Sequence, residues 1–188
     1  METVSPFEAY TARKLYIHNA AHAILGYLGY QRGHEYGYEA LNDPWVASKL
    51  SSGLSESSRA LIAEFHFEPV ALREHIEYLL VRFANRALAD PIGRLARDPL
   101  RKLSPDDRLV GAARLAERHG IRVDGLAWGI AAALAFDDPY DAHAVALQER
   151  IAADGVEQTL AGVCEISSGE ALGERVLEHY RELVTLSH

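Results

Sequence analysis

The sequence lacks most features that mark secreted, membrane-spanning or nucleic-acid-binding proteins. It has one cysteine in 188 residues, which excludes an internal disulfide and fits a reducing compartment. Its first ten residues have no basic segment followed by an apolar run, so we expect no signal peptide. The longest nearly apolar stretch, 125–136, is too short to cross a bilayer and predicts a buried helix. With a net charge of −8, we expect a cytoplasmic protein that binds neither nucleic acid nor membrane.

Glycine-rich loops that bind phosphate are missing too. No G-x-G-x-x-G follows a strand-like segment, and no G-x-x-x-x-G-K-[ST] occurs. Gly26, Gly29, Gly33 and Gly37 lie in or just after a segment expected to be helical, so they match neither motif. We therefore expect that this chain binds no dinucleotide by itself.

Helix signals dominate what is present. Each of the seven prolines follows a serine, aspartate or glutamate, and a short polar side chain before proline is typical of a helix start. These pairs are Ser5-Pro6, Asp43-Pro44, Glu68-Pro69, Asp90-Pro91, Asp98-Pro99, Ser104-Pro105 and Asp138-Pro139. Apolar residues recur at helical spacing between them, as in 72–83 and 160–180, and period-two runs are absent. We predict one all-α domain of roughly eight to ten helices.

Four polar residues cluster near the N-terminus. On a helix of about 100° per residue, Lys14, His18, His22 and Asn19 fall within less than half the circumference. A solvated or internally satisfied polar face explains such spacing. His18 and His22 also have metal-ligand spacing, but no glutamate follows His18 and no third ligand is evident. An acid–base site is the third interpretation, in which burial lowers the pKa of the lysine so that it acts as a base, and the amide and imidazole hold an oxygen.

The segment 82–108 is basic within an acidic chain. It has seven basic and four acidic residues, a local charge of +3. An ordinary charged surface would explain this composition. A site for an anion or a polyol, formed by arginine forks and a lysine, is the functional alternative.

Both segments resemble the polyol-specific long-chain dehydrogenases, which include mannitol 2-dehydrogenase and mannitol-1-phosphate 5-dehydrogenase. Lysine, asparagine five residues later and histidine eight residues later are similar to that family's signature, and RKL at 13–15 with HNAAHA at 18–23 is most similar to its mannitol-1-phosphate branch. The family uses the lysine as general base without metal, the asparagine in an oxyanion site and the histidine for the substrate hydroxyl. The resemblance implies these roles for Lys14, Asn19 and His22.

The basic segment resembles the same family in the patterns R-F-x-N, R-x-x-R-x-P-x-R-K-L and D-R-L, found here within 82–109. Arg94 and Lys102 match positions of the family that contact substrate. Arg97 and Arg101 are our own further candidates for a phosphate. Where the family has a proline after the asparagine, this chain has Arg86.

The resemblance implies that residues 1–188 form the helical, substrate-binding C-terminal domain, similar to that of 6-phosphogluconate dehydrogenase-like enzymes. A Rossmann domain carrying NAD would lie outside this sequence, in a partner chain or in an omitted segment. We therefore expect the substrate-binding and catalytic-lysine half of an NAD-dependent dehydrogenase for a polyol, a ketose or their phosphates. This half would be inactive alone, and its open cleft wall would favour a homodimer. The alternative is a non-catalytic module that binds a sugar phosphate or a partner.

Overall fold

The computed structural model describes residues 6–186, and all regular secondary structure in that range is helical. The segments are α1 (Pro6–Arg13), η1 (Lys14–Asn19), α2 (Ala20–Gln31), α3 (Gly37–Asn42), α4 (Pro44–Phe65), α5 (Pro69–Phe83), α6 (Ile92–Ala96), α7 (Pro99–Lys102), α8 (Val110–Arg118), α9 (Gly125–Leu134), α10 (Ala142–Asp154), α11 (Val156–Cys164) and α12 (Ala171–Leu186). The all-α prediction is confirmed. The thirteen segments within residues 6–186 outnumber the eight to ten that the sequence predicts with short helices included, partly because α1, η1 and α2 are one continuous helix.

Most prolines begin helices, as the sequence predicts. Pro6, Pro44, Pro69 and Pro99 are the first residues of α1, α4, α5 and α7. The carboxylate of Asp43 accepts a hydrogen bond from the N–H of Trp45 at 2.9 Å and so caps α4. Pro91 directly precedes α6, whereas Pro105 and Pro139 lie outside helices. Ser5, the expected cap of α1, lies outside the described residues.

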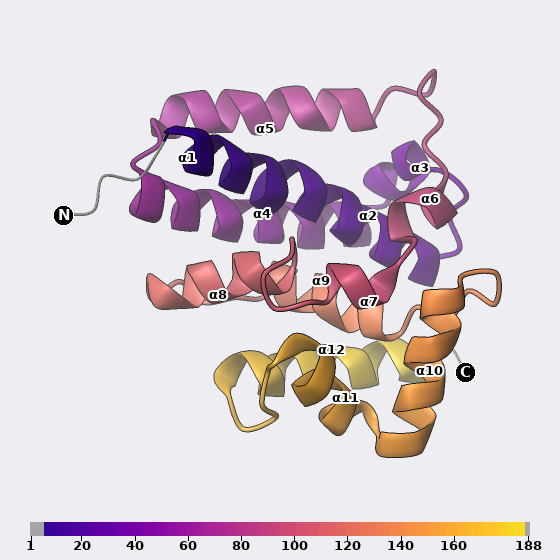
Figure 1. Ribbon diagram of the computed structural model, residues 1–188. Coiled ribbons are helices and arrows are strands. Elements are labelled where there is room, and N and C mark those ends of the chain that lie inside the picture. The colour runs from indigo at the N-terminus through magenta and orange to yellow at the C-terminus, as the bar shows by residue number, and fades with distance from the viewer. Residues whose placement is uncertain (1–5, 187–188) are drawn as a thin grey trace.

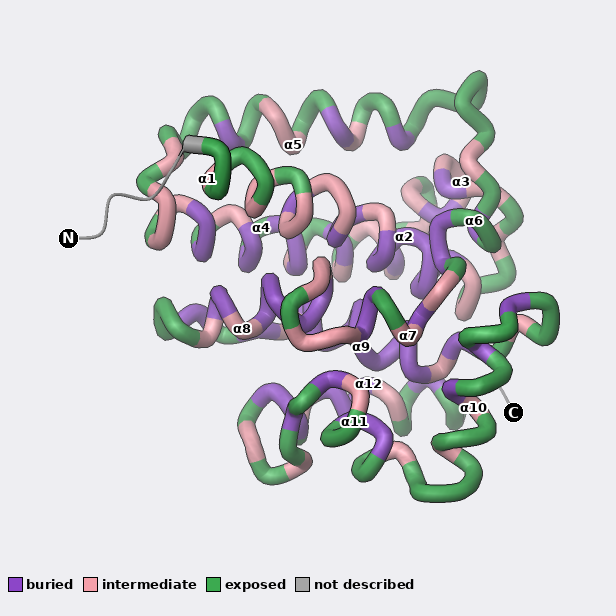
Figure 2. The backbone as a smooth tube through the Cα atoms, in the orientation of Figure 1, coloured by how far each residue is buried: buried purple, intermediate pink, exposed green. Residues whose placement is uncertain are grey.

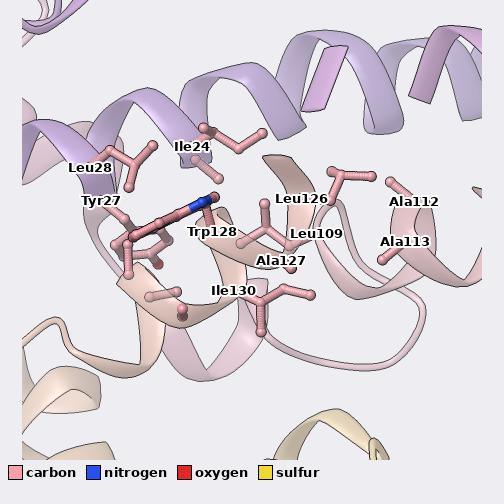
Figure 3. Packing of buried hydrophobic residues seen from close by; sticks show 14 of the residues in the cluster. Ile24, Tyr27, Leu28, Leu109, Ala112, Ala113, Leu126, Ala127, Trp128 and Ile130 are labelled. Atoms are coloured by element: carbon pink, nitrogen blue, oxygen red, sulfur yellow. The ribbon is translucent and has the colours of Figure 1, made fainter. Parts of the chain in front are cut away.

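The helices are stacked in layers around α9 (Figure 1). All ten residues of α9 are buried, which confirms the buried helix expected in 125–136. Helices α2, α4, α8 and α12 pack against it. Figure 3 shows Ile24 and Leu28 of α2 above Trp128 of α9 in this view. The core thus supports α2 from below and leaves the opposite side of α2 for other contacts.

Helix α5 forms the outermost layer on the side of α1 (Figure 1). Leu72, Leu79 and Phe83 are buried on its inner side, as the apolar stripe predicts. Most of its remaining surface is exposed (Figure 2). The end of α5 reaches α2, because the ring of Phe83 stacks on His22.

Candidate functional site

Lys14 and Asn19 lie at the two ends of a π-helical turn within a continuous helix of residues 6–31. The N–H of Ala20 donates to the carbonyl oxygen of Leu15, five residues earlier. In this wider turn, residues five apart lie closer to the same side of the helix than the separation of about 140° in an α-helix. The π-turn therefore brings the half-buried Asn19 nearer to the side of Lys14. Such turns occur frequently at functional sites.

His22 lies one turn further along this helix, in an apolar and cationic environment. Its ring stacks on Phe83 at 4.3 Å between centroids, and the ring of His18 contacts it edge-on at 4.7 Å. Burial, followed by the charges of His18, Arg94, Lys102 and Arg108, lowers the pKa of His22 to about 3. The imidazole is therefore neutral near neutral pH. It can donate or accept a hydrogen bond to a substrate hydroxyl but does not supply a charge.

Two glycines let the basic segment approach the helix of His22. A Cβ atom on Gly26 would lie 2.8 Å from the backbone carbon of Leu95, and one on Gly29 would lie 2.7 Å from the Cδ1 atom of Ile92. Any side chain at Gly26 would therefore push α6 away from α2. Because α6 carries Arg94 and precedes Lys102, these glycines position the basic segment beside His22.

Lys102 is a buried amine between α2 and α6. The residue is 4% exposed. Its Nζ atom donates to the carbonyl oxygen of Leu95 at 2.5 Å and lies 5.4 Å from the centre of the Tyr27 ring. Burial, with the nearby charges of Arg108 and Arg101, lowers the pKa of Lys102 to about 7. The amine is therefore only partly protonated near neutral pH.

We expect Lys102→Met to stabilise the folded chain and to flatten its pH dependence. A lysine in an unfolded chain has a pKa of about 10.4, whereas the folded pKa is about 7. Between these values the unfolded chain binds more protons, so the contribution of Lys102 makes stability rise with pH. Its destabilising effect is largest at and below the folded pKa. There the variant should gain about 1–3 kcal/mol, partly offset by the lost hydrogen bond to Leu95.

Urea unfolding at a series of pH values measures both effects. The chain has three lysines, Lys14, Lys49 and Lys102. Lys14→Met is the matched control, because that side chain is exposed, and its stability profile should follow that of the wild type. A Lys102→Met profile with the unchanged slope of the wild type would show that this amine does not titrate as described.

The amine of Lys14 differs from the sequence-based expectation. Lys14 is exposed, and no hydrogen bond or ion pair of its amine occurs among the described residues. This chain alone does not provide the expected desolvation. The amine still lies within electrostatic reach of the site, because its charge helps burial, Arg82 and His75 to lower the pKa of His18.

The four predicted basic residues fall into two groups. The positive charges of Arg94 and Lys102 both lower the pKa of His22. The Arg94 side chain is 60% exposed and forms an ion pair with Asp90. Arg97 and Arg101 instead line a separate cavity of about 630 Å³, which none of the other predicted site residues lines. Three aspartates, among them Asp98, line the same cavity, and Asp98 pairs with Arg101 at 2.9 Å.

Sequence reasoning left several neighbours of the site unassigned. Phe83 holds the imidazole of His22, and the charge of Arg82 acts on His18. The positive charge of Arg108 lowers the pKa of both His22 and Lys102. Arg82 and Phe83 lie in the pattern R-F-x-N, and Arg108 lies in the pattern D-R-L. These two patterns could therefore have identified the three residues from the sequence. The departure at Arg86 places its guanidinium 5.4 Å from the ring centre of Tyr38.

Two other interpretations concern metals and membranes. Among residues 6–186, no group of three or more histidine, cysteine, aspartate or glutamate side chains is arranged to hold a metal ion. His18 and His22 therefore remain a pair of contacting rings. No helix in the described part of the chain is both long and apolar enough to cross a membrane.

Solved structures place the fold in a class. A substrate-free D-sorbitol dehydrogenase matches with a TM-score of 0.74 at 18% identity, covering 96% of this chain and 40% of that one. The Pseudomonas fluorescens mannitol 2-dehydrogenase, solved as a ternary complex with NAD and D-mannitol, matches with a TM-score of 0.71 at 22% identity, covering 97% and 39%. The fold is thus that of a helical part of polyol dehydrogenases.

The particular family follows from the sequence. The chain belongs to the mannitol dehydrogenase C-terminal domain family, whose model matches residues 6–184. Mannitol-1-phosphate 5-dehydrogenase of Brevibacillus brevis is 39% identical over 180 residues, covering 96% of this chain and 47% of that protein. The same enzyme of Geobacillus thermodenitrificans is 38% identical over 181 residues, covering 96% and 47%. The chain spans about half the length of these curated relatives.

Proposed function

We propose that this chain is the substrate-binding and catalytic-lysine half of an NAD-dependent dehydrogenase for a polyol or polyol phosphate. The observation that carries the proposal is the imidazole of His22, stacked on Phe83 and carried by the same continuous helix as Lys14 and Asn19. The relatives named mannitol-1-phosphate 5-dehydrogenase support the substrate class.

Each residue has a role that follows from its chemistry. Lys14 takes the proton of the substrate hydroxyl during oxidation and returns it during reduction. His22 and Asn19 hold the substrate oxygen by hydrogen bonds that strengthen as negative charge develops on it. Lys102 and Arg94 bind the rest of the substrate and fix its orientation.

A second half is needed for the oxidant. The described residues form no strand apart from an isolated bridge between Tyr36 and Pro91, so they hold no strand–turn–helix site for a dinucleotide. NAD would be bound by a nucleotide-binding half, either in a partner chain or in the same polypeptide. That half would also cover the exposed Lys14 and supply the desolvation that this chain does not.

Exposed apolar side chains favour such a covering. Phe7 and Tyr10 on α1 precede Lys14 by about two turns and one turn, and Phe7 is 79% exposed. Tyr78 and Val81 are exposed on the neighbouring α5. Aromatic residues in this arrangement are typical of surfaces that are covered by a partner. A homodimer through the same surface is the competing arrangement.

Reconstitution tests the proposal. The chain would be assayed for NADH formation with mannitol 1-phosphate and with mannitol, alone and together with a Rossmann half of a relative or of its own genomic neighbourhood. We expect turnover only when both halves are present. The alternative, a non-catalytic module, predicts binding of the sugar phosphate but no turnover with any nucleotide-binding half.

A further inference from the structure

Arg108 presents an unused pair of hydrogen-bond donors beside the candidate site. It lies between α7 and α8, and its side chain is 13% exposed. Its Nε atom donates to Asp107 Oδ1 at 2.7 Å, and its backbone N–H donates to the same oxygen at 2.6 Å. No hydrogen bond of its two Nη atoms occurs among the described residues.

These Nη atoms are still accessible. The fully buried side-chain atoms without partners, within the described part of the chain, are Tyr27 Oη, Ser57 Oγ and His179 Nδ1. The Nη atoms of Arg108 are not among them, so they reach solvent although most of the side chain is covered. A guanidinium fixed at Nε, whose Nη atoms have no partner among the described residues, can make a two-pronged contact with an oxyanion.

Arg108 lies on the segment that joins Lys102 to α8, near the candidate site. The segment 103–109 lies against η1, because a Cβ atom on Gly111 would be 2.8 Å from the hydroxyl of Tyr16 and 3.0 Å from the carbonyl oxygen of Asp106. On its other side the segment follows directly from Lys102. The charge of Arg108 acts on both His22 and Lys102.

The local charge favours an anion. Arg94 is paired with Asp90 and Arg108 with Asp107, whereas Lys102 bonds only to a carbonyl oxygen. Two arginines and a partly protonated amine therefore face two carboxylates within a chain of net charge −8. Lys14 and Arg82 add two charges that have no carboxylate partner among the described residues. A neutral polyol gains little from this excess, whereas a phosphate dianion gains charge-assisted hydrogen bonds.

The other candidate for a phosphate is less suitable. The cavity of Arg97 and Arg101 is also lined by Asp98, Asp138 and Asp141, which would repel a dianion. It is separate from His22, so a phosphate bound there would not orient a hydroxyl toward the imidazole.

We propose that Arg108 binds the phosphate of a phosphorylated substrate and, together with Lys102 and Arg94, selects it over the free polyol. This inference rests on the proposed function, since it assigns one end of the same substrate. It assigns the phosphate to Arg108, the arginine of the D-R-L pattern, in place of Arg97 and Arg101.

Calorimetric titration of the full chain with inorganic phosphate, mannitol 1-phosphate and mannitol tests this assignment. The variant Arg108→Gln should weaken binding of both phosphates by about tenfold or more and leave the affinity for mannitol within about twofold. Arg122→Gln is the matched control, because Arg122 is an exposed arginine before α9 that lines none of this site. It should bind all three compounds as the wild type does.

Further variants keep the outcome clear if Arg108→Gln folds poorly. The double variant Asp107→Asn, Arg108→Gln also removes the carboxylate that Arg108→Gln leaves without its ion-pair partner. Arg108→Lys retains the positive charge but not the two parallel N–H donors of the guanidinium. Phosphate binding equal to that of the wild type in the folded double variant would overturn the assignment, as would a wild-type chain that binds no phosphate. Both results leave the reconstitution assay untouched. The converse result is phosphate binding that depends on Arg108 while no reconstituted system shows turnover. That result would contradict the proposed function and support the phosphate site.

Discussion

Lys14→Ala is expected to lower turnover by about 10²–10⁴-fold in a preparation that contains both this chain and a nucleotide-binding half. The reason is that the two histidines on the same side of this helix are poor bases, and the amine of Lys102 is held by the carbonyl oxygen of Leu95. His22 has a pKa of about 3 and is too weak a base, and His18 also has a lowered pKa. The measurement is steady-state NADH formation with saturating substrate, and kcat should fall much more than KM rises.

Two further variants separate the role of the amine as a base from its charge. Lys14→Arg keeps a positive charge but cannot release a proton near neutral pH, so it should be about as inactive as the alanine variant. Added small primary amines should restore part of the activity of Lys14→Ala and none of that of Lys14→Arg. Lys49→Ala is the control, because Lys49 lies between the rings of Trp45 and Trp128, away from the site. Turnover of Lys14→Ala within tenfold of the wild type would rule out this base.

The sequence predicts one side of this site well, and the reason is local. Residues 6–31 form one helix, so the spacing of Lys14, Asn19 and His22 already decides that they share a side. The sequence does not predict the π-turn, because an i→i+5 hydrogen bond depends on packing around the helix and not on residue preference. It also does not predict the exposure of Lys14, which depends on what covers α1.

The basic segment was harder to predict because a single residue changes its direction. Asp98 has a left-handed backbone with φ of 63°, which is uncommon for a residue with a side chain. It separates α6 from α7, and its amide donates to Asp141 Oδ2 at 2.7 Å. The charges of Arg94 and Lys102 lower the pKa of His22, whereas Arg97 and Arg101 line the cavity beside α10. The composition of the segment does not distinguish these four basic residues from one another.

A buried glutamate at the centre of the fold is likewise invisible to pattern reasoning. Glu56 lies on α4 and is 5% exposed. Its carboxylate accepts hydrogen bonds from the N–H groups of Asp124, Gly125 and Leu126 at 2.8–3.0 Å, and from Ser52 Oγ at 2.9 Å. It thus caps α9 from another helix, where a sequence search considers only the residues adjoining the helix start. The negative charge also suits the positive end of the α9 dipole.

Glu56→Ala is therefore expected to destabilise the chain by about 4 kcal/mol, because three N–H groups, two of them buried, lose their acceptor. Water cannot easily replace the carboxylate, since α4 and α9 are in backbone contact: a Cβ atom on Gly125 would lie only 2.6 Å from the carbonyl oxygen of Lys49. Chemical denaturation measures the loss. Glu64→Ala on the same helix is the control, because Glu64 bonds His119 at the surface and its removal should cost less than about 1 kcal/mol.

The loss at Glu56 should also reach the site, since α9 supports the helix that carries His22. Glu56→Gln retains the size of the side chain but replaces one acceptor oxygen by a donor, so we expect an intermediate loss of about 2 kcal/mol. In that variant the amide protons of Asp124, Gly125 and Leu126 should exchange faster with solvent before the chain unfolds globally. If both variants unfold at the denaturant concentration of the wild type, the carboxylate does not hold α9, and the site must be supported from α4 by side-chain packing alone.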